Sequence, residues 1–440
     1  AKMEEFIGRQ VVLSQARVQE LNDSHFCIRP AMSIEHHVIC QRCGSQLAKA
    51  EHRLPSGKYF CSVCLKFGKL TSDDRLVSII ESPDSQLPRE VLLTWQGSLT
   101  TLQQTITDRL LQSIHAGRNS LVWAVTGSGK TEMIFYPIHA VLSKGGRVCV
   151  TSPRIDVCRE LYPRIKNAFE LEPVLLLHGN SEESYCYRKL TICTTHQLLH
   201  FYQAFDLIIV DEIDAFPYEG DPMLRYGLKQ ALHPTGRLIY LTATPPQHLL
   251  REVEATFAIE KLPVRFHKRP LIVPECHWYF RWESCYKKPS RMKKFLKLLR
   301  ELLQDNDVLV FCPSLSYMDA LYQATSRFFA EDIITSVHAE DENRKEKVEK
   351  MRQKKYRILF TSTILERGVT FERVSVIVMG ANHAVFSKSA LVQIAGRVDR
   401  KGAYHHGRVL FFYNQNTQAI RQARNEIKEM NALAKKVGDK

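Results

Sequence analysis

The stretch Leu121-Val-Trp-Ala-Val-Thr-Gly-Ser-Gly-Lys-Thr131 decides the fold. Its first five residues form a short apolar run rich in Val and Leu, which is typical of a buried strand in a parallel sheet. The run leads directly into Ala124-Val-Thr-Gly-Ser-Gly-Lys-Thr131, a glycine-rich turn that ends in a Lys-Thr pair. This order predicts a strand, a tight loop and a helix that begins near Thr131.

The loop fits the pattern that binds nucleotide phosphates, except that Ala124 stands in the first glycine position. Gly127 and Gly129 allow a tight turn whose backbone N–H groups face phosphate oxygens at the positive end of a helix. We expect Lys130 to contact the β- and γ-phosphates of ATP, and the Thr131 hydroxyl to bind Mg²⁺. The predicted nucleotide-binding residues of the loop are Thr126, Gly127, Ser128, Gly129, Lys130 and Thr131.

Similar strand-like runs recur on both sides of the loop, separated by stretches compatible with helices. The first series contains 121–125, 147–150, 207–210 and 238–241; the second contains 308–311, 357–360, 376–379 and 409–412. We therefore expect two tandem α/β domains with parallel sheets, preceded by a smaller module. The predicted divisions are 1–89, 90–262 and 263–440, with a C-terminal amphipathic helix that carries Ile420, Ala423, Ile427, Met430 and Ala434 on its core face.

Carboxylates follow the run Leu207-Ile-Ile-Val210, at the end of what should be a neighbouring strand. We expect Asp211 to hold the Mg²⁺ shell and Glu212 to orient and deprotonate the attacking water. Asp214 is equally consistent with a helix cap and with a catalytic group. Upstream, the amide of Gln103 suits the two-sided hydrogen bonding of adenine, although an isolated glutamine is more often a surface residue.

Four of the twelve cysteines form two pairs, Cys40-Gln-Arg-Cys43 and Cys61-Ser-Val-Cys64, that are seventeen residues apart. This spacing is typical of two zinc knuckles, and four thiolates leave no open position for a substrate water. We expect a structural Zn²⁺ in a zinc-ribbon-like module at about residues 38–68. The less favoured substitute ligands are His36, His37 and His52.

The formal net charge of +14 is concentrated in residues 261–300, the basic junction, which holds twelve Lys or Arg against Glu275 and Glu283. Cations alternate there with rings at 278–280 and at Trp282, the combination that single-strand binders use. We favour core positions for the rings and nucleic-acid contacts for some of the lysines. The apolar runs are far shorter than the ~20 residues of a membrane helix, and no signal-peptide pattern is present, so we expect a cytosolic protein.

Taken together and in order, the motifs resemble the superfamily 2 helicase signature. They are 124–131, Asp211-Glu-Ile-Asp214, Thr242-Ala-Thr244 and Gln393-Ile-Ala-Gly-Arg-Val-Asp-Arg400. The resemblance implies two RecA-like domains, with Arg397 and Arg400 as arginine fingers for the γ-phosphoryl group and Gln393 aligning them. It also implies that Thr242–Thr244 and 361–370 relay the nucleotide state, and that Ser152-Pro-Arg154 and 194–197 contact a nucleic-acid backbone.

The chain also resembles the ComFA family of late-competence DNA-uptake ATPases over longer segments. These segments are 153–162, 195–199, 201–207, 211–217 and 363–371. Asp214 and Val398-Asp399 depart from the DEAD-box RNA helicases. The resemblance implies an ATP-dependent translocase or helicase on single-stranded DNA, with competence proteins such as ComFC and a membrane DNA channel as partners at the inner face of the membrane. The alternatives are a primosomal replication-restart helicase and a zinc-ribbon adaptor that uses ATP only as a switch.

Overall fold

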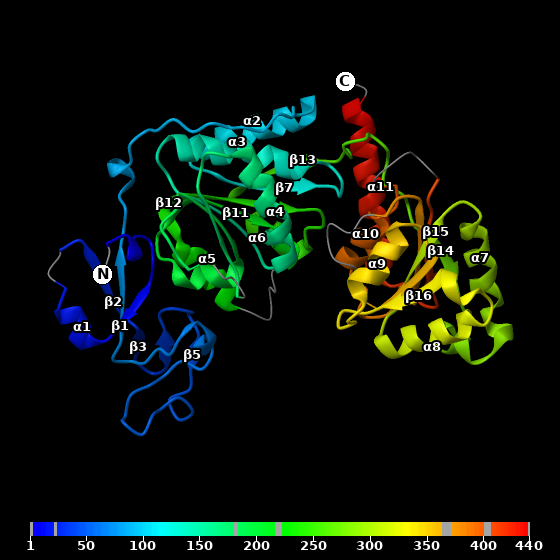
Figure 1. Ribbon diagram of the computed structural model, residues 1–440, viewed down its shortest axis with the longest axis horizontal. Helices are drawn as coiled ribbons and strands as arrows, with labels where there is room; N and C mark the ends of the chain where they lie inside the picture. Colours follow the sequence, from blue (N-terminus) through cyan, green and yellow to red (C-terminus); the bar gives the residue numbers. More distant parts are fainter. Residues whose placement is uncertain are drawn as a thin grey trace. The chain divides into compact units, whose positions relative to one another are not determined.

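The structure, a computed structural model, describes residues 3–21, 24–179, 184–215, 222–362, 371–399 and 406–438. The chain separates into two compact units, which are shown in sequence colours in Figure 1. The first comprises Ala1–Val122, Lys130–Thr242 and Gln247–Glu260; the second comprises Trp123–Gly129, Ala243–Pro246 and Lys261–Lys440. The three-part division at residues 89 and 262 stays a prediction.

A seven-stranded sheet is the centre of the first unit, with strand order β13-β7-β12-β11-β8-β10-β9. Every pair from β12 across to β9 is parallel, and the strands β8, β10 and β11 are almost entirely buried. The strands are β7 (Asn119–Ala124), β8 (Val148–Ser152), β9 (Val174–Leu177), β10 (Leu190–Thr194), β11 (Phe205–Asp211), β12 (Leu232–Thr242) and β13 (Phe257–Leu262).

Helices of this unit cover the sheet and bring the motif residues to the strand ends. Helix α2 begins with a capping box between Thr100 and Gln103, and it packs on α3, which starts at Lys130 directly after the glycine-rich loop (Figure 1). The helices are α2 (Thr101–His115), α3 (Lys130–Ser143), α4 (Ile155–Ala168), α5 (Pro222–Ala231) and α6 (Gln247–Val253), with the 3₁₀ turns η4 (Thr195–His200) and η5 (Ile213–Ala215).

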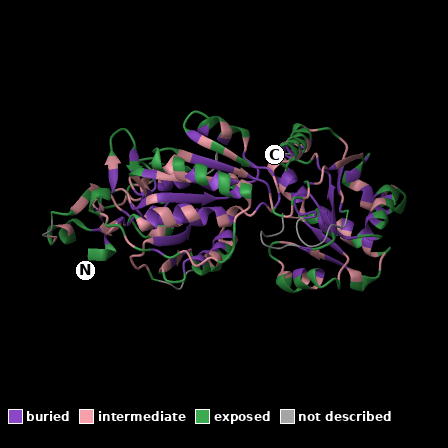
Figure 2. Cartoon of the chain, turned by 90° about the horizontal axis from the view of Figure 1, so that it is seen from above, coloured by how far each residue is buried: buried purple, intermediate pink, exposed green. Residues whose placement is uncertain are grey.

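The second unit contains a six-stranded, all-parallel sheet of order β14-β19-β18-β15-β17-β16. Leu309 and Phe311 enter one core cluster while Val308 and Val310 enter another, so both faces are covered, and Figure 2 shows the strands as buried. The strands are β14 (Glu275–Trp278), β15 (Asp307–Phe311), β16 (Ile334–Val337), β17 (Ile358–Thr361), β18 (Val374–Met379) and β19 (Val409–Tyr413).

Helices α7 and α11 of the second unit are strongly amphipathic. Helix α11 buries Ile420, Ala423, Ile427 and Met430, as the sequence predicts, whereas Ala434 is only partly buried. The helices are α7 (Lys293–Leu303), α8 (Leu315–Ser326), α9 (Arg344–Arg352), α10 (Lys388–Ala395) and α11 (Gln418–Gly438), and η6 (Trp282–Lys287) and η7 (Pro289–Met292) precede α7. The parallel-sheet domains predicted from sequence are therefore confirmed. Among the described residues, no helix has the length and apolarity that crossing a membrane requires.

Two small antiparallel sheets form the amino-terminal part of the first unit, with orders β1-β6-β2 and β3-β4-β5. Their elements are β1 (Val11–Leu13), α1 (Gln15–Gln19), β2 (Phe26–Pro30), β3 (Met32–Ile34), β4 (Val38–Cys40), β5 (Gln46–Leu47), η2 (Leu65–Phe67) and β6 (Arg75–Ile79). The second sheet and the turns around it carry the two cysteine pairs, so this region is the smaller module expected ahead of the α/β domains.

Candidate nucleotide site and metal centre

The glycine-rich loop has the conformation that its sequence predicts. Gly127 and Gly129 lie at φ 79° and 77°, a left-handed region that side chains rarely adopt. Ser128 and Thr131 are buried, whereas Thr126 is partly exposed. The loop therefore joins β7 to α3 with its special backbone angles at the two positions that lack a Cβ.

Asp211 and Lys130 meet at the carboxyl end of the sheet. Lys130 Nζ donates to Asp211 Oδ1 at 2.7 Å, and the backbone N–H of Glu212 donates to the same oxygen at 2.9 Å. Asp211 and Glu212 are only 3% and 1% exposed, so this ion pair is largely removed from water. The expectation of adjacent strands is wrong, because β12 lies between β7 and β11. Lys130 contacts Asp211 from the start of α3, a helix that packs against β11.

Glu212 lies in a strained turn directly after β11, at φ 56°. Its carboxylate Oε2 lies 3.8 Å from Arg154 Nε, and Arg154 also bonds to Asp156. Arg154 directly precedes α4 and follows the carboxyl end of β8, the strand next to β11. Arg154 was predicted to contact a nucleic-acid backbone. In the structure it lies close to Glu212, the predicted catalytic carboxylate.

Sequence reasoning missed Arg164, which lies on α4. Its Nη1 donates to Thr131 Oγ1 at 3.1 Å, and its Nη2 pairs with Glu132. The contact orients the hydroxyl that is predicted to bind Mg²⁺. No sequence pattern marks Arg164, because its connection to Thr131 depends on how two helices pack.

Asp214 and Gln103 each have a structural partner. Asp214 Oδ1 accepts from Thr242 Oγ1 at 2.8 Å, which joins the end of β11 to the end of β12. This contact links the second motif to Thr242-Ala-Thr244, the segment predicted to relay the nucleotide state. Gln103 is 3% exposed, so the surface alternative is wrong, and its Oε1 accepts from the Thr100 N–H at 2.9 Å.

The second unit holds the other predicted catalytic residues. Gln393 lies on α10, and Arg397 follows that helix with 8% of its surface exposed. Arg400 and the motif residues 363–370 and 216–217 lie outside the described residues. Sequence reasoning counted Arg265 in the basic junction, but its buried guanidinium donates to the carbonyls of Val398 and Asp399, both at 2.8 Å. Arg265 therefore fixes the turn that carries Arg397.

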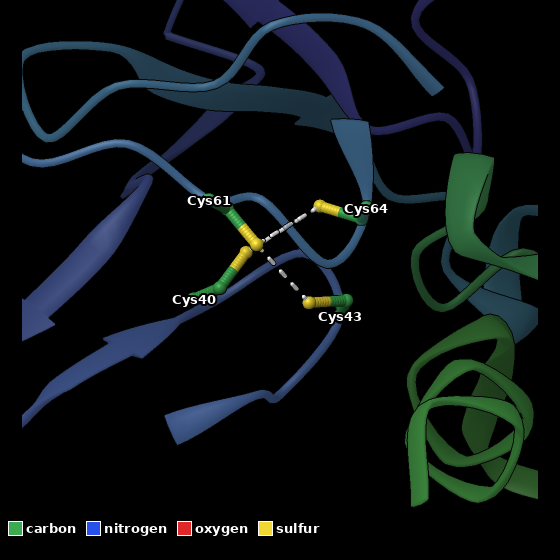
Figure 3. A group of neighbouring side chains, drawn as sticks. All are labelled: Cys40, Cys43, Cys61 and Cys64. Carbon is green, nitrogen blue, oxygen red and sulfur yellow. Dashed lines mark hydrogen bonds between the residues drawn. The ribbon is translucent and has the colours of Figure 1, made fainter. Parts of the chain in front are cut away.

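The four cysteine sulfurs converge from two turns, as Figure 3 shows. All four side chains are buried, and their sulfur atoms lie within 4.8 Å of one another. The Sγ–Sγ distances are 3.8 Å for Cys40 and Cys64, 3.7 Å for Cys43 and Cys61, and 3.5 Å for Cys61 and Cys64. A tetrahedron with Zn–S bonds of about 2.3 Å has S–S edges of about 3.8 Å, so the cluster fits Zn²⁺. His52 instead bonds to Ala48 and Ser62.

Arg42 lies within the first cysteine pair and is 2% exposed. Its Nη2 lies 3.1 Å from Cys64 Sγ and its Nε lies 3.3 Å from the same sulfur. Its guanidinium also donates to the carbonyls of Cys64, Phe67 and Gly68. Four thiolates around a divalent ion carry net negative charge, and a buried guanidinium offsets it while tying the second turn in place. Sequence reasoning did not assign this role to Arg42.

The cysteine module packs on the α/β part of the same unit. Leu199 of η4 and Met223 of α5 belong to the hydrophobic cluster that contains the four cysteines. Tyr226 of α5 donates to the Gln41 carbonyl at 2.8 Å, and Phe67 packs edge-on against His200 with ring centroids 5.3 Å apart. Burial lowers the pKa of His200 to about 4, so this ring is neutral at physiological pH and acts in packing.

The rings of the basic junction divide into two groups. Tyr279 and Trp282 are 4% exposed and belong to the core, as predicted. Trp278 and Phe280 are 53% and 69% exposed, so the core prediction is wrong for them. Trp278 is the last residue of β14 and Phe280 lies in the turn that follows it, whereas Tyr279 between them packs into the core against Phe412.

Two RecA-like parallel-sheet domains with this loop and carboxylate arrangement define a superfamily 2 helicase, a class whose domains bind ATP and Mg²⁺. The chain matches the DEAD/DEAH box helicase family over residues 100–253 and the helicase conserved C-terminal domain over residues 290–402. Dbp5 of Saccharomyces cerevisiae, solved with RNA and ADP BeF3, has the same fold at 15% identity and a TM-score of 0.54, covering 77% of this chain and 93% of that one.

More specifically, the chain belongs to the ComFA family of competence proteins. It is 40% identical to competence protein ComFA of Streptococcus pneumoniae, over 92% of this chain and 93% of that protein. It is 38% identical to ComFA of Bacillus subtilis, over 90% and 86% of the two chains. By contrast, replication restart protein PriA of Bacillus subtilis is 28% identical over 35% of this chain and 21% of its own length.

Proposed function

We propose that this chain is an ATP-driven motor that pulls single-stranded DNA during DNA uptake in natural transformation. The observation that carries the proposal is the contact of Lys130 with the buried Asp211, with Glu212 directly beside it. A nucleotide site needs a cation for phosphate oxygens, a carboxylate for the Mg²⁺ shell and a base for water, and these three residues supply them. Thr131, held by Arg164, adds a hydroxyl ligand for Mg²⁺.

We favour a motor that hydrolyses ATP over an adaptor that only changes conformation when ATP binds. A switch needs phosphate binding, but it does not need a buried carboxylate pair positioned for water attack. In the proposed cycle, Arg397 and Arg400 reach the γ-phosphoryl group when the domains close, and Gln393 aligns them. Uptake is favoured over replication restart because the similarity to ComFA extends over nine-tenths of the chain, whereas PriA matches only about a third of it.

We assign Zn²⁺ to Cys40, Cys43, Cys61 and Cys64 as a structural ion. The donor set consists of four thiols, and soft thiolate ligands with tetrahedral spacing select zinc among the common divalent metals. The ion would hold the two turns together, with Arg42 offsetting the charge of the thiolates. In this role the module acts as a rigid extension of the first unit.

The proposed cellular setting follows from the family. Competence proteins such as ComFC and the membrane DNA channel are the partners we propose, with the motor acting at the inner face of the membrane through them. Single-stranded DNA is the proposed track, and Arg154 and the η4 segment, at the carboxyl ends of the neighbouring strands β8 and β10, are its proposed backbone contacts in the first unit.

Replacing Lys287, Lys288, Lys293 and Lys294 together with Ala should weaken binding of single-stranded DNA. All four are exposed, and none forms an ion pair with another described residue. Each phosphate that a lysine neutralises contributes about 0.7 to the slope of log affinity against log salt, so the slope should flatten by as much as about 3. Fluorescence anisotropy of a labelled oligonucleotide across a salt series measures both quantities.

The matched control replaces Lys428, Lys435 and Lys436 of α11, which are also exposed cations of the second unit. This variant should keep the wild-type salt slope, and thermal denaturation should show both variants folded. If the quadruple variant kept the wild-type affinity for single-stranded DNA and the wild-type salt slope, the basic junction would not be the DNA-binding surface. Absence of single-strand binding by the wild-type protein would contradict the proposed function itself.

A further inference from the structure

Two aromatic side chains stand in solvent at the end of the edge strand of the second sheet. Trp278 is the last residue of β14, and Phe280 lies two residues beyond it. Their exposed fractions are 53% and 69%, although a folded domain gains stability by burying such rings. Aromatic rings that remain exposed in the folded chain are available to stack on a ligand.

The backbone below the rings is firmly anchored. Tyr279 packs edge-on against Phe412 with ring centroids 5.2 Å apart, and its hydroxyl donates to the Arg291 carbonyl at 2.6 Å. Its N–H donates to the Tyr413 carbonyl at 2.7 Å, which continues the pairing of β14 with β19. Trp278 and Phe280 are therefore presented from a fixed strand end.

Neighbouring side chains orient the two rings. The ring of Tyr413 meets Trp278 edge-on, at 84° with centroids 5.6 Å apart, and leaves about half of the Trp278 side chain in water. The guanidinium carbon of Arg281 lies 5.0 Å from the centroid of the Phe280 ring. Lys294, at the start of α7, donates to the carbonyl of Trp278, so a cation lies directly beside the rings.

Positive charge surrounds this site, which we name the aromatic platform (Trp278, Phe280, Arg281 and Lys294). Residues 278–294 contain six Lys or Arg and one acid, Glu283. Glu283 accepts a hydrogen bond from the Asn414 side chain at 2.6 Å. Lys287, Lys288 and Lys293 are exposed and form no ion pair within the described part of the chain. Exposed cations beside exposed aromatic rings suit a ligand that carries many negative charges together with flat apolar groups.

We propose that the aromatic platform stacks unpaired bases of single-stranded DNA while the adjacent lysines follow its phosphates. This inference rests on the proposed function and deepens it, because it names the residues that distinguish a single strand from a duplex. Bases of a duplex are stacked on one another and present no free face, whereas unpaired bases stack on aromatic side chains at about 1–3 kcal/mol each. The platform would hold the strand against the second unit.

The test compares two ligands of equal charge, an oligo(dT) strand and the same strand with abasic sites in its central positions. The full chain, Trp278→Ala/Phe280→Ala and Trp278→Phe are titrated with each ligand by fluorescence anisotropy. The double alanine variant should bind oligo(dT) at least about tenfold more weakly than the wild type. Trp278→Phe should recover most of the affinity, because it restores a flat ring. All proteins should bind the abasic strand with similar, weaker affinity, since only the lysine contacts remain.

The control is Leu171→Ala, which removes an even more exposed apolar side chain, 74% accessible, from the first unit and should leave the affinity for oligo(dT) unchanged. Thermal denaturation establishes that each variant is folded. Wild-type affinity for oligo(dT) in the double variant would overturn the platform while leaving the motor intact, and so would an equal loss for the abasic strand. If the wild-type protein bound neither strand, the proposed function would fail together with the platform.

Discussion

Lys130→Ala should lower the rate of Mg²⁺-dependent ATP hydrolysis by at least about a hundredfold. Lys130 Nζ lies 2.7 Å from Asp211, so the variant removes the proposed phosphate contact and one partner of a carboxylate that is 3% exposed. Because a lysine at this position neutralises phosphate charge, we expect weaker binding of ATP as well as slower turnover. Steady-state kinetics with a coupled ATPase assay, together with binding of a fluorescent ATP analogue, separate the two effects.

Glu212→Gln should slow hydrolysis by a similar factor but keep ATP bound. The variant retains the size of the side chain in its strained turn, and it removes the carboxylate that we propose accepts a proton from water. Matched controls are Lys229→Ala and Glu254→Gln, which change exposed residues of the same unit. If Lys130→Ala and Glu212→Gln both turned over ATP at near the wild-type rate, the assignment of the nucleotide site would be wrong.

Cys40→Ser combined with Cys61→Ser should abolish binding of the one Zn²⁺ that we expect per chain, because two of its four thiolates are lost. Residues near 40–70 should then unfold, since the sulfur cluster lies at the centre of their core. The α/β domains should remain folded on their own cores, although exposure of Leu199 and Met223 should lower their melting temperature. Metal analysis and limited proteolysis measure these effects.

Two further variants sharpen the metal assignment. Cys27→Ser changes a partly exposed cysteine outside the cluster and should leave the zinc content unchanged. Arg42→Met keeps all four thiols but removes the buried guanidinium, so zinc should bind in the purified protein and be lost faster to a chelator. Zinc at wild-type stoichiometry in the double cysteine variant, or no zinc in the wild type, would contradict the assignment.

Local sequence patterns predicted the features that depend on short stretches of chain. The β-branched runs indicated both parallel sheets, because strands covered on two faces must be apolar throughout. The glycine spacing predicted the phosphate loop, since positive φ angles at Gly127 and Gly129 exclude most other residues. The paired cysteines predicted the sulfur cluster, because each Cys-x-x-Cys turn aims two thiols at one point.

Features that depend on tertiary packing were missed or wrong. Arg164 and Arg42 have partners far away in sequence or on another turn, and no spacing rule connects them to Thr131 or to Cys64. Arg265 has the sequence appearance of a surface cation, yet it is buried against backbone carbonyls. Trp278 and Phe280 were expected in the core because the composition of this segment does not reveal that the edge strand ends at Trp278 and that a turn follows it.

The central claim is tested most directly by measuring ATP turnover in parallel without nucleic acid, with single-stranded DNA, with duplex DNA and with RNA. In the proposed cycle, a strand bound across both domains would favour their closure and bring Arg397 and Arg400 to the nucleotide, so we expect DNA binding and ATP hydrolysis to be coupled. We predict that single-stranded DNA raises turnover severalfold above the basal rate and more than the other ligands do. Turnover that is indifferent to all three nucleic acids, or that rises with RNA and not with DNA, would contradict the account of a DNA-uptake motor.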